Sequence, residues 1–238
     1  MKTGSRHGFT LPEIATVAGL LGLISTGVMG FFIQSLKSSN ASEQQIELLS
    51  TMRSFMDEMI FNGSRSHEFV LYNSSSAADR TAVNRKAVLN ADNETESDDV
   101  CPTGDFAVFV FYELPKPSDE DRYRIQKLIG YYLDDTGSGP PALVRMTIDL
   151  GSSPSNDTVE EILSDHWGTA KRRTIAHRVT PLALSDGYDE QTTPQLFYKR
   201  ASQNIAVCGQ LLQSTARLDT QDARTQTRTF YFTVTVRS

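Results

Sequence analysis

The sequence predicts an α+β protein with a long N-terminal helix and a β-rich head. Residues 14–36 carry no charged side chain, and apolar residues at mostly three- and four-residue spacing follow over residues 46–60. Beyond residue 63 the pattern changes to short apolar runs separated by turn-forming residues. We therefore expect a helix whose first half is apolar on every side and whose second half packs on a mainly antiparallel sheet.

The composition fits one membrane segment joined to one globular body. The chain has 238 residues, of which 39% are hydrophobic, and a formal net charge of −6. This length is enough to bury a core. Nucleic-acid binding needs clustered Lys and Arg against phosphate, so general nucleic-acid binding is not expected of an acidic chain. The consecutive cations Lys171, Arg172 and Arg173 are expected in a solvated loop.

The uncharged run of residues 14–36 is long enough to cross a bilayer, which takes about 20 apolar residues. The competing interpretation is a secretory signal peptide, whose apolar region is about 7–15 residues and ends at a small-residue cleavage site. The run here is longer, and no clear site follows it. Lys2 and Arg6 precede the run, and the positive-inside rule therefore places the N-terminus in the cytoplasm and the head across the membrane.

The sequence GFTLPE occupies residues 8–13, directly before the apolar run. It resembles the cleavage and methylation motif of type IV prepilins and type II secretion pseudopilins. In that family a prepilin peptidase/methyltransferase cuts after the glycine and methylates the new N-terminus. The resemblance implies that residues 1–8 are a leader ending at Gly8, that Phe9 becomes the methylated N-terminus, and that Glu13 is the fifth mature residue.

Glu13 is a single carboxylate at the edge of the apolar run. A charge in that place is costly unless it has a partner or a function. In the family that the motif resembles, the acid faces the N-terminal amine of a neighbouring subunit as the filament grows. Such an ion pair is strong in a low-dielectric bundle and helps to set register. The alternative is that Glu13 lies in the headgroup layer, where the helix dipole favours it.

Together these features divide the chain into four segments. We expect a cleaved leader at residues 1–8, a transmembrane half-helix at residues 9–36, an amphipathic half-helix at residues 37–62 and a globular β-rich head at residues 63–238. Asn62-Gly63 is expected to end the helix. The apolar stripe of the second half-helix is expected to be core, and it comprises Ile46, Leu49, Met52, Phe55, Met56, Met59 and Ile60.

The head is expected to contain strands at residues 67–72, 106–112, 125–133, 142–150, 175–184, 195–198, 205–213 and 230–236. FAVFVFY, at residues 106–112, is apolar on both faces and indicates a central strand. DDTGSGPP separates the third and fourth strands and predicts a hairpin. Asp157, with Glu160 three residues on, predicts a short helix over residues 157–166. Residues 73–99 are expected to form an exposed loop with one strand-like piece near Val88.

No catalytic or metal-binding motif stands out in the head. His67, His166 and His177 lack metal-ligand spacing, and there is no GxSxG, GxxxxGK[ST] or GxGxxG sequence. We expect a non-enzymatic protein without a cofactor; a membrane-anchored enzyme is the remote alternative. The run ADNETESDD offers oxygen ligands for Ca²⁺ but lacks the spacing of an EF-hand, so it is expected to be solvated.

Two cysteines leave a further alternative open. Cys101 and Cys208 can form a disulfide if the head lies outside the cytoplasm, and closing so long a loop would contribute about 4–5 kcal/mol in the chain-entropy model. The other interpretation is a pair of buried free thiols.

The order of the hairpin, the VTPLAL and FYK strands and the last strand loosely resembles the J-type minor pseudopilin of type II secretion. The resemblance implies a structural subunit of a pilin-like filament, held in the inner membrane with other pilin-like subunits as partners. The alternative is a minor type IV pilin of a surface filament used for adhesion, motility or DNA uptake. After loss of residues 1–8, the remainder of the 238-residue chain is large for a repeated subunit, which favours a minor position.

Overall fold

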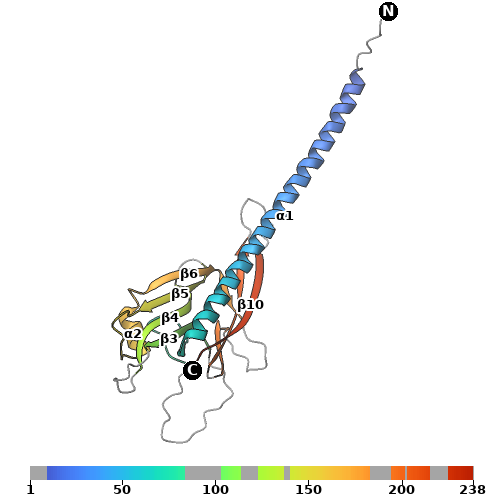
Figure 1. Ribbon diagram of the computed structural model, residues 1–238. Helices are drawn as coiled ribbons and strands as arrows, with labels where there is room; N and C mark the ends of the chain where they lie inside the picture. Colours follow the sequence, from blue (N-terminus) through green and yellow to red (C-terminus); the bar gives the residue numbers. More distant parts are fainter. Residues whose placement is uncertain are drawn as a thin grey trace, which may run out of the picture. The chain divides into compact units, whose positions relative to one another are not determined.

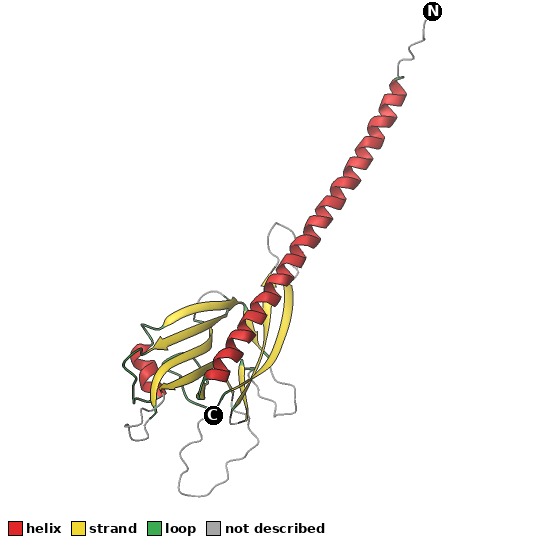
Figure 2. Ribbon diagram, in the orientation of Figure 1, coloured by secondary structure: helices red, strands yellow, loops and turns green. Residues whose placement is uncertain are grey.

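The computed structural model of the protein describes residues 10–83, 103–113, 123–136, 140–182, 194–201, 203–214 and 225–237. Within these ranges it contains two helices and ten strands, which confirms the α+β class (Figure 2). The chain divides into two compact units, Met1–Glu47 and Leu48–Ser238.

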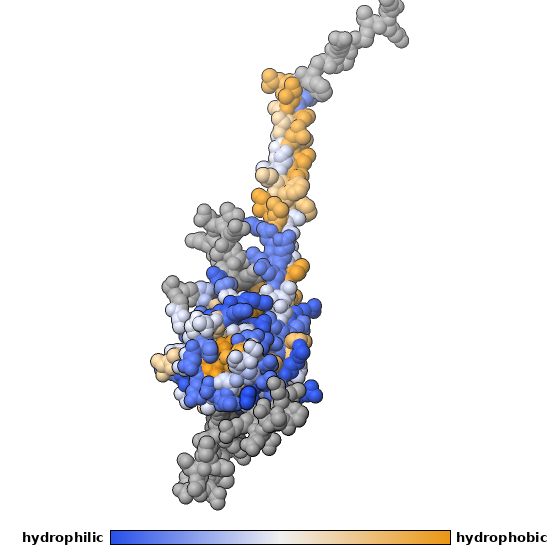
Figure 3. Space-filling model, turned by 60° about the vertical axis from the view of Figure 1, so that its left-hand side comes forward, coloured by the Kyte–Doolittle hydropathy of each residue, from blue (hydrophilic) through white to orange (hydrophobic). Residues whose placement is uncertain are grey.

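The described part of the first unit consists of helix α1 (Leu11–Arg65) up to Glu47. Every residue from Leu11 to Asn40 is exposed, including large apolar residues such as Phe31, which is 71% exposed. Figure 3 shows this part of the helix mostly in orange, the colour of hydrophobic residues. The helix is long and apolar enough to cross a membrane. The expected apolar first half of the helix is therefore confirmed.

In the second unit, α1 continues from Leu48 to Arg65 and contributes a narrow line of side chains to the core. Phe55 and Met59 are buried, as expected. Ile46, Leu49 and Ile60 are 67%, 45% and 42% exposed, so their assignment to the core was wrong. The inward line repeats at alternating four- and three-residue steps, and Leu49 and Ile60 each lie one residue beside it. The residues of the line are Leu48, Met52, Phe55, Met59 and Asn62.

The expected helix stop at Asn62-Gly63 is wrong, because α1 continues to Arg65. Gly63 is buried inside the helix, and a Cβ built on it would overlap the Val234 Cγ1 methyl group. Glycine is therefore required here by the close approach of α1 to the last strand rather than by a helix end.

The strands form two antiparallel sheets, which agrees with the mainly antiparallel head expected (Figure 1). The order in sheet A is β1 (Glu68–Tyr72), β3 (Phe106–Glu113), β4 (Arg124–Asp134), β5 (Ala142–Asp149) and β6 (Lys171–His177). The order in sheet B is β10 (Thr225–Thr235), β9 (Asn204–Ser214), β8 (Phe197–Ala201) and β2 (Thr103–Gly104), and β7 (Val179–Pro181) also pairs with β9.

Sheet A has an apolar cluster on each face. Ala107 and Phe109 of β3 face the cluster shared with α1 and sheet B, whereas Phe106 and Val108 face the cluster under helix α2 (Val159–His166). A strand covered on both faces is apolar at successive positions, as expected for β3. The predicted short helix is confirmed, although its capping box joins Thr158 and Glu161, one residue later than expected.

The single strand expected at residues 175–184 is instead two strands in different sheets. β6 ends sheet A, β7 pairs with β9 in sheet B, and Arg178 between them has a φ of 58°. This left-handed residue lets the chain change sheets, and no hydrophobic pattern signals it. Lys171, Arg172 and Arg173 lie in β6 and not in the loop that was expected.

The remaining strand predictions fall on observed strands at slightly different bounds. The strand expected at residues 230–236 falls within β10, where apolar and polar residues alternate: Phe230, Phe232 and Val234 are buried, whereas Tyr231 and Thr233 are exposed. The strand-like piece near Val88 lies outside the described residues.

Candidate functional site

The N-terminus of α1 is capped by two hydrogen bonds from one residue to a single carboxylate oxygen. The backbone N–H and the hydroxyl of Thr10 both donate to Glu13 Oε2, at 2.9 and 2.8 Å. In the other direction, the Glu13 N–H donates to the Thr10 carbonyl at 3.0 Å. A Glu at the third helical position that satisfies the N-cap N–H is half of a capping box. Glu13 is exposed, and within the described residues its Oε1 accepts no hydrogen bond.

Thr10 caps the start of α1, and this role was not predicted from the sequence. Its signal was present, since Thr-x-x-Glu before an apolar run is the spacing of a capping box. This local role explains the Thr and the Glu of GFTLPE but not the glycine and the phenylalanine. Gly8 and Phe9 lie outside the described residues.

Two threonine hydroxyls along the apolar part of α1 are satisfied inside the helix. The Thr16 hydroxyl donates to the Pro12 carbonyl at 2.7 Å, and the Thr26 hydroxyl donates to the Gly22 carbonyl at 2.9 Å. These bonds satisfy the two threonine hydroxyls without water, as a bilayer core requires. At Gly19, Gly22, Gly27 and Gly30 an added Cβ would meet nothing within 4 Å. Contacts within this chain therefore do not require these glycines.

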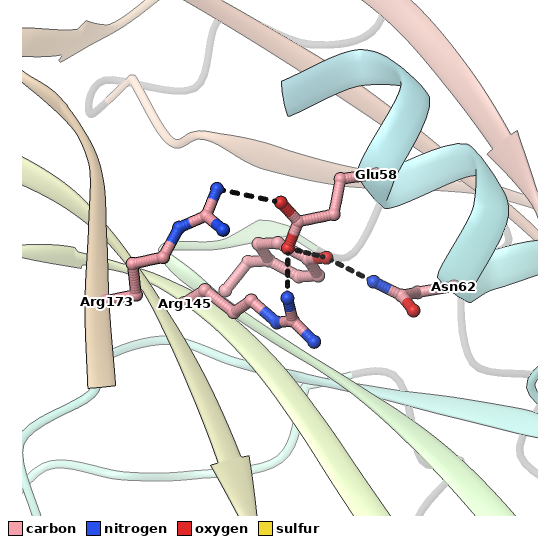
Figure 4. Close-up of polar contacts among 5 residues, drawn as sticks. Glu58, Asn62, Arg145 and Arg173 are labelled. Atoms are coloured by element: carbon pink, nitrogen blue, oxygen red, sulfur yellow. Dashed lines mark hydrogen bonds and ion pairs between the residues drawn. The ribbon is translucent and has the colours of Figure 1, made fainter. Parts of the chain in front are cut away.

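A polar network in the second unit joins α1 to sheet A (Figure 4). Glu58 Oε1 lies 2.7 Å from Arg145 Nη1 of β5, and Glu58 Oε2 lies 3.3 Å from Arg173 Nη2 of β6. The Tyr131 hydroxyl donates to Glu58 Oε1 at 3.3 Å and accepts from Asn62 Nδ2 at 2.6 Å. One carboxylate on the helix is thus held by three side chains from three strands of the sheet.

The environment of this network keeps Tyr131 neutral. Burial, followed by the nearby negative charge of Glu58, raises the pKa of the Tyr131 hydroxyl well above its ordinary value. A neutral hydroxyl can donate to the carboxylate and accept from the amide at once. The Glu58 and Arg145 side chains are 16% and 25% exposed, whereas Arg173 is 63% exposed. The Glu58–Arg145 contact is therefore the better shielded of the two ion pairs.

Asp105 links the two sheets at the short connection between β2 and β3. Its Oδ1 accepts the N–H of Leu196, just before β8, at 2.9 Å. Burial raises the pKa of the Asp105 carboxyl to about 6, with a further increase from nearby Asp135, while the bond from Leu196 opposes the shift. This carboxyl therefore changes charge near neutral pH.

The three histidines considered from the sequence lie in different parts of the head. His67 accepts the N–H of Tyr112 through Nδ1 at 3.2 Å, His166 ends α2, and His177 ends β6. The described residues contain no group of three or more His, Cys, Asp or Glu side chains placed to hold a metal ion. Cys208 is buried in β9, whereas Cys101 and the ADNETESDD run lie outside the described residues. Their disulfide and calcium alternatives therefore stay predictions.

No family model matches the chain, and neither a curated protein nor a solved structure matches it. What the protein does must therefore be inferred from its own residues and fold.

Proposed function

We propose that this chain is a non-enzymatic structural subunit of a pilin-like filament, and specifically a minor pseudopilin of a type II secretion system. The observation that carries the proposal is the sequence GFTLPE at residues 8–13, followed at once by a helix of membrane length. A signal peptide would explain the apolar run but not the motif on its cytoplasmic side. An antiparallel β-rich head after the same helix fits the architecture that the motif implies.

In this proposal a prepilin peptidase removes residues 1–8 and methylates Phe9. The amine of Phe9 in an incoming subunit then pairs with Glu13 of its neighbour. Thr10 bonds to Glu13 Oε2 within the same chain, and Oε1 accepts no hydrogen bond within the described residues. An ion pair formed where water is scarce is strong and sensitive to geometry, so it sets the register of one subunit against the next.

The exposed first part of α1 supports a place among lipids and other helices. The Thr16 and Thr26 hydroxyls bond to carbonyls of the same helix, and a Cβ added at any of its four glycines would meet nothing within 4 Å. Small residues let helices of different subunits approach closely in a membrane. With Lys2 and Arg6 in the cytoplasm, the head lies on the periplasmic side of the inner membrane.

The N-terminus of the mature protein tests the proposal. Mass spectrometry of the chain purified from membranes should find N-methylated Phe9 as the first residue, with the apolar helix retained. Gly8→Ala should leave a full-length, membrane-held precursor. Gly4→Ala is the matched control, because it changes a leader glycine outside the motif and should leave processing intact. A mature chain that starts after residue 25 would identify an ordinary signal peptide and reject the proposal.

Co-purification then distinguishes a secretion-system filament from a surface pilus. The proposal expects the processed chain to be isolated with periplasmic pilin-like subunits of a secretion system. Recovery in sheared filaments from the cell surface would instead identify a type IV pilin.

A further inference from the structure

Sheet A ends in β1 and β6 and sheet B in β10 and β2, apart from the three-residue β7 beside β9, and two of these four end strands are short or partly covered. An edge strand presents unpaired N–H and C=O groups that can template pairing with another chain. At β1, the Leu71 carbonyl accepts the N–H of Val83, and Tyr72 forms an antiparallel bridge with Ala82. β2 contains only the two residues Thr103–Gly104. Neither edge offers a long row of open main-chain groups.

The third edge, β6, carries two features that discourage pairing. Lys171, Arg172 and Arg173 are consecutive and exposed. The register of β6 against β5 also shifts between Leu143 and Val144, which marks a β-bulge or a similar irregularity. Charged side chains and bulges are the common means by which native edge strands avoid adding another strand.

The fourth edge, β10, has no register shift and a single charged side chain, Arg228. It spans 11 residues and pairs with β9 along its whole length without a register shift. Just beyond it, the Val236 N–H donates to the Gln203 carbonyl, so the main chain of Val236 faces the β9 side. In an antiparallel pair, alternate residues point their N–H and C=O groups toward the partner and away from it. The residues that point away from β9 are Thr227, Thr229, Tyr231, Thr233 and Thr235.

These five residues form the open edge of β10. Their side chains are all exposed, and none of them carries a charge. Threonine and tyrosine are favoured in strands, so the side chains of the open edge are compatible with pairing to a further strand. Within the described residues, no main-chain hydrogen bond joins the open edge to another segment.

Among the described strands of sheet B, every charged side chain is positive. The strands of sheet B contain no Asp or Glu, although the chain has 29 acidic residues. Arg228 in β10 and Arg237 just beyond it are exposed, and neither forms an ion pair within the described residues. At about 3.4 Å per residue they lie about 30 Å apart, at opposite ends of the open edge.

We propose that the open edge of β10 is a docking site for an extended acidic segment of a partner protein, which adds to sheet B as a further strand. Main-chain hydrogen bonds supply most of the affinity in strand addition. Carboxylates near the two ends of the segment pair with Arg228 and Arg237 and fix its register. This inference does not depend on assembly of the chain into a filament.

The test uses the full-length protein in detergent and a fluorescent, blocked peptide as long as β10. The probe alternates threonine and valine and has glutamate at both ends; a second probe has lysine at both ends. The glutamate probe should bind more tightly, and its advantage should shrink at high ionic strength because salt screens exposed charges. Amide exchange at the five open-edge residues should slow when the glutamate probe binds.

Thr233→Pro removes one outward N–H and places a ring on the open edge, while the β9 pairing keeps its hydrogen bonds. It should weaken binding of the glutamate probe by about tenfold or more. Thr233→Val, which keeps the N–H, is the matched control and should bind as the wild type does. Unfolding followed by Trp167 fluorescence verifies that both variants remain folded.

Replacing both arginines, Arg228→Glu with Arg237→Glu, should reverse the preference in favour of the lysine probe. The proposal is overturned if neither probe binds, or if the glutamate probe binds wild type and Thr233→Pro equally well. It is also overturned if the charge-reversed variant still prefers the glutamate probe. Self-association of the chain that Thr233→Pro abolishes, without binding of the glutamate probe, would assign the edge to a second copy and also reject the acidic partner.

Discussion

The two parts of α1 differ in where their polar side chains find hydrogen-bond partners. The first part runs up to Glu47, and the second part runs from Leu48 to Arg65. In the first part, Thr16 and Thr26 bond to carbonyls of their own helix, and large apolar side chains are exposed. In the second part, Glu58 and Asn62 bond to residues far away in the sequence. A helix in lipid must satisfy its polar groups internally, whereas one in a protein core can share them with its neighbours.

The comparison implies that an aromatic side chain in the second part of α1 stabilises the head, whereas one in the first part does not. Phe55 is 3% exposed and makes edge-to-face contacts with Tyr131, Phe230 and Phe232. Phe55→Ala should lower the free energy of unfolding of the head by about 3–5 kcal/mol. Denaturant unfolding, followed by the fluorescence of Trp167, measures this loss.

Phe31→Ala is the matched control, because Phe31 is 71% exposed in the first part of the helix. It should change the stability of the head by less than about 0.5 kcal/mol. If Phe31→Ala and Phe55→Ala lower the free energy of unfolding equally, the two parts of the helix do not differ in their contribution to the stability of the head.

A smaller effect is expected when the polar network of Figure 4 is broken. Glu58→Ala leaves Arg145 partly buried without its carboxylate, so it should cost about 2–3 kcal/mol, less than for a fully buried pair. Asp57→Ala changes the exposed neighbouring acid and should cost less than about 0.5 kcal/mol. If the two variants unfold at the same denaturant concentration, the network does not hold the helix to sheet A.

The smallest effect is expected at Asp105, a buried polar group elsewhere in the head. Folding raises the pKa of this carboxyl from 3.8 to about 6, so the folded head keeps the proton to a higher pH than the unfolded chain. The stability that this adds is fully present below about pH 4 and is lost as the pH rises through about 6. Asp105→Asn imitates the protonated form and should exceed the wild type by about 1–2 kcal/mol at pH 7.

Denaturant unfolding of wild type and Asp105→Asn at pH 4 and pH 7 tests this expectation. The advantage of the variant should nearly disappear at pH 4, where the wild-type carboxyl is protonated in both states. A difference of the same size at both pH values would show that Asp105 affects stability by packing and not by its charge.

The features that the sequence predicts well are those set by local periodicity. The alternation in β10 and the apolar run of β3 both place the buried residues on the correct faces, since covering a strand on one or both faces leaves a direct pattern. The first part of α1 is equally easy to predict from the sequence, because no charged residue interrupts residues 14–36.

The errors arise where a distant part of the chain decides the local structure. Gly63 reads as a helix stop but is needed for contact with Val234, which lies far along the chain. Arg178 changes sheets within an apparently continuous strand. The contacts of Glu58 with Arg145 and Arg173 were not predicted, because these partners come from strands whose register the sequence does not reveal. The Thr10–Glu13 cap, by contrast, is local and could have been predicted.

The charge of Glu13 is the most direct test of the filament proposal. Glu13→Gln removes the negative charge but keeps a side-chain acceptor for the Thr10 N–H, since Gln also serves in capping boxes. Glu13→Leu removes both. We predict that membrane insertion and protease resistance of the head are unchanged in both variants. Co-purification with other pilin-like subunits should fall about tenfold or more in both. Wild-type co-purification of Glu13→Gln would contradict the proposal and leave Glu13 with only a local role at the start of its helix.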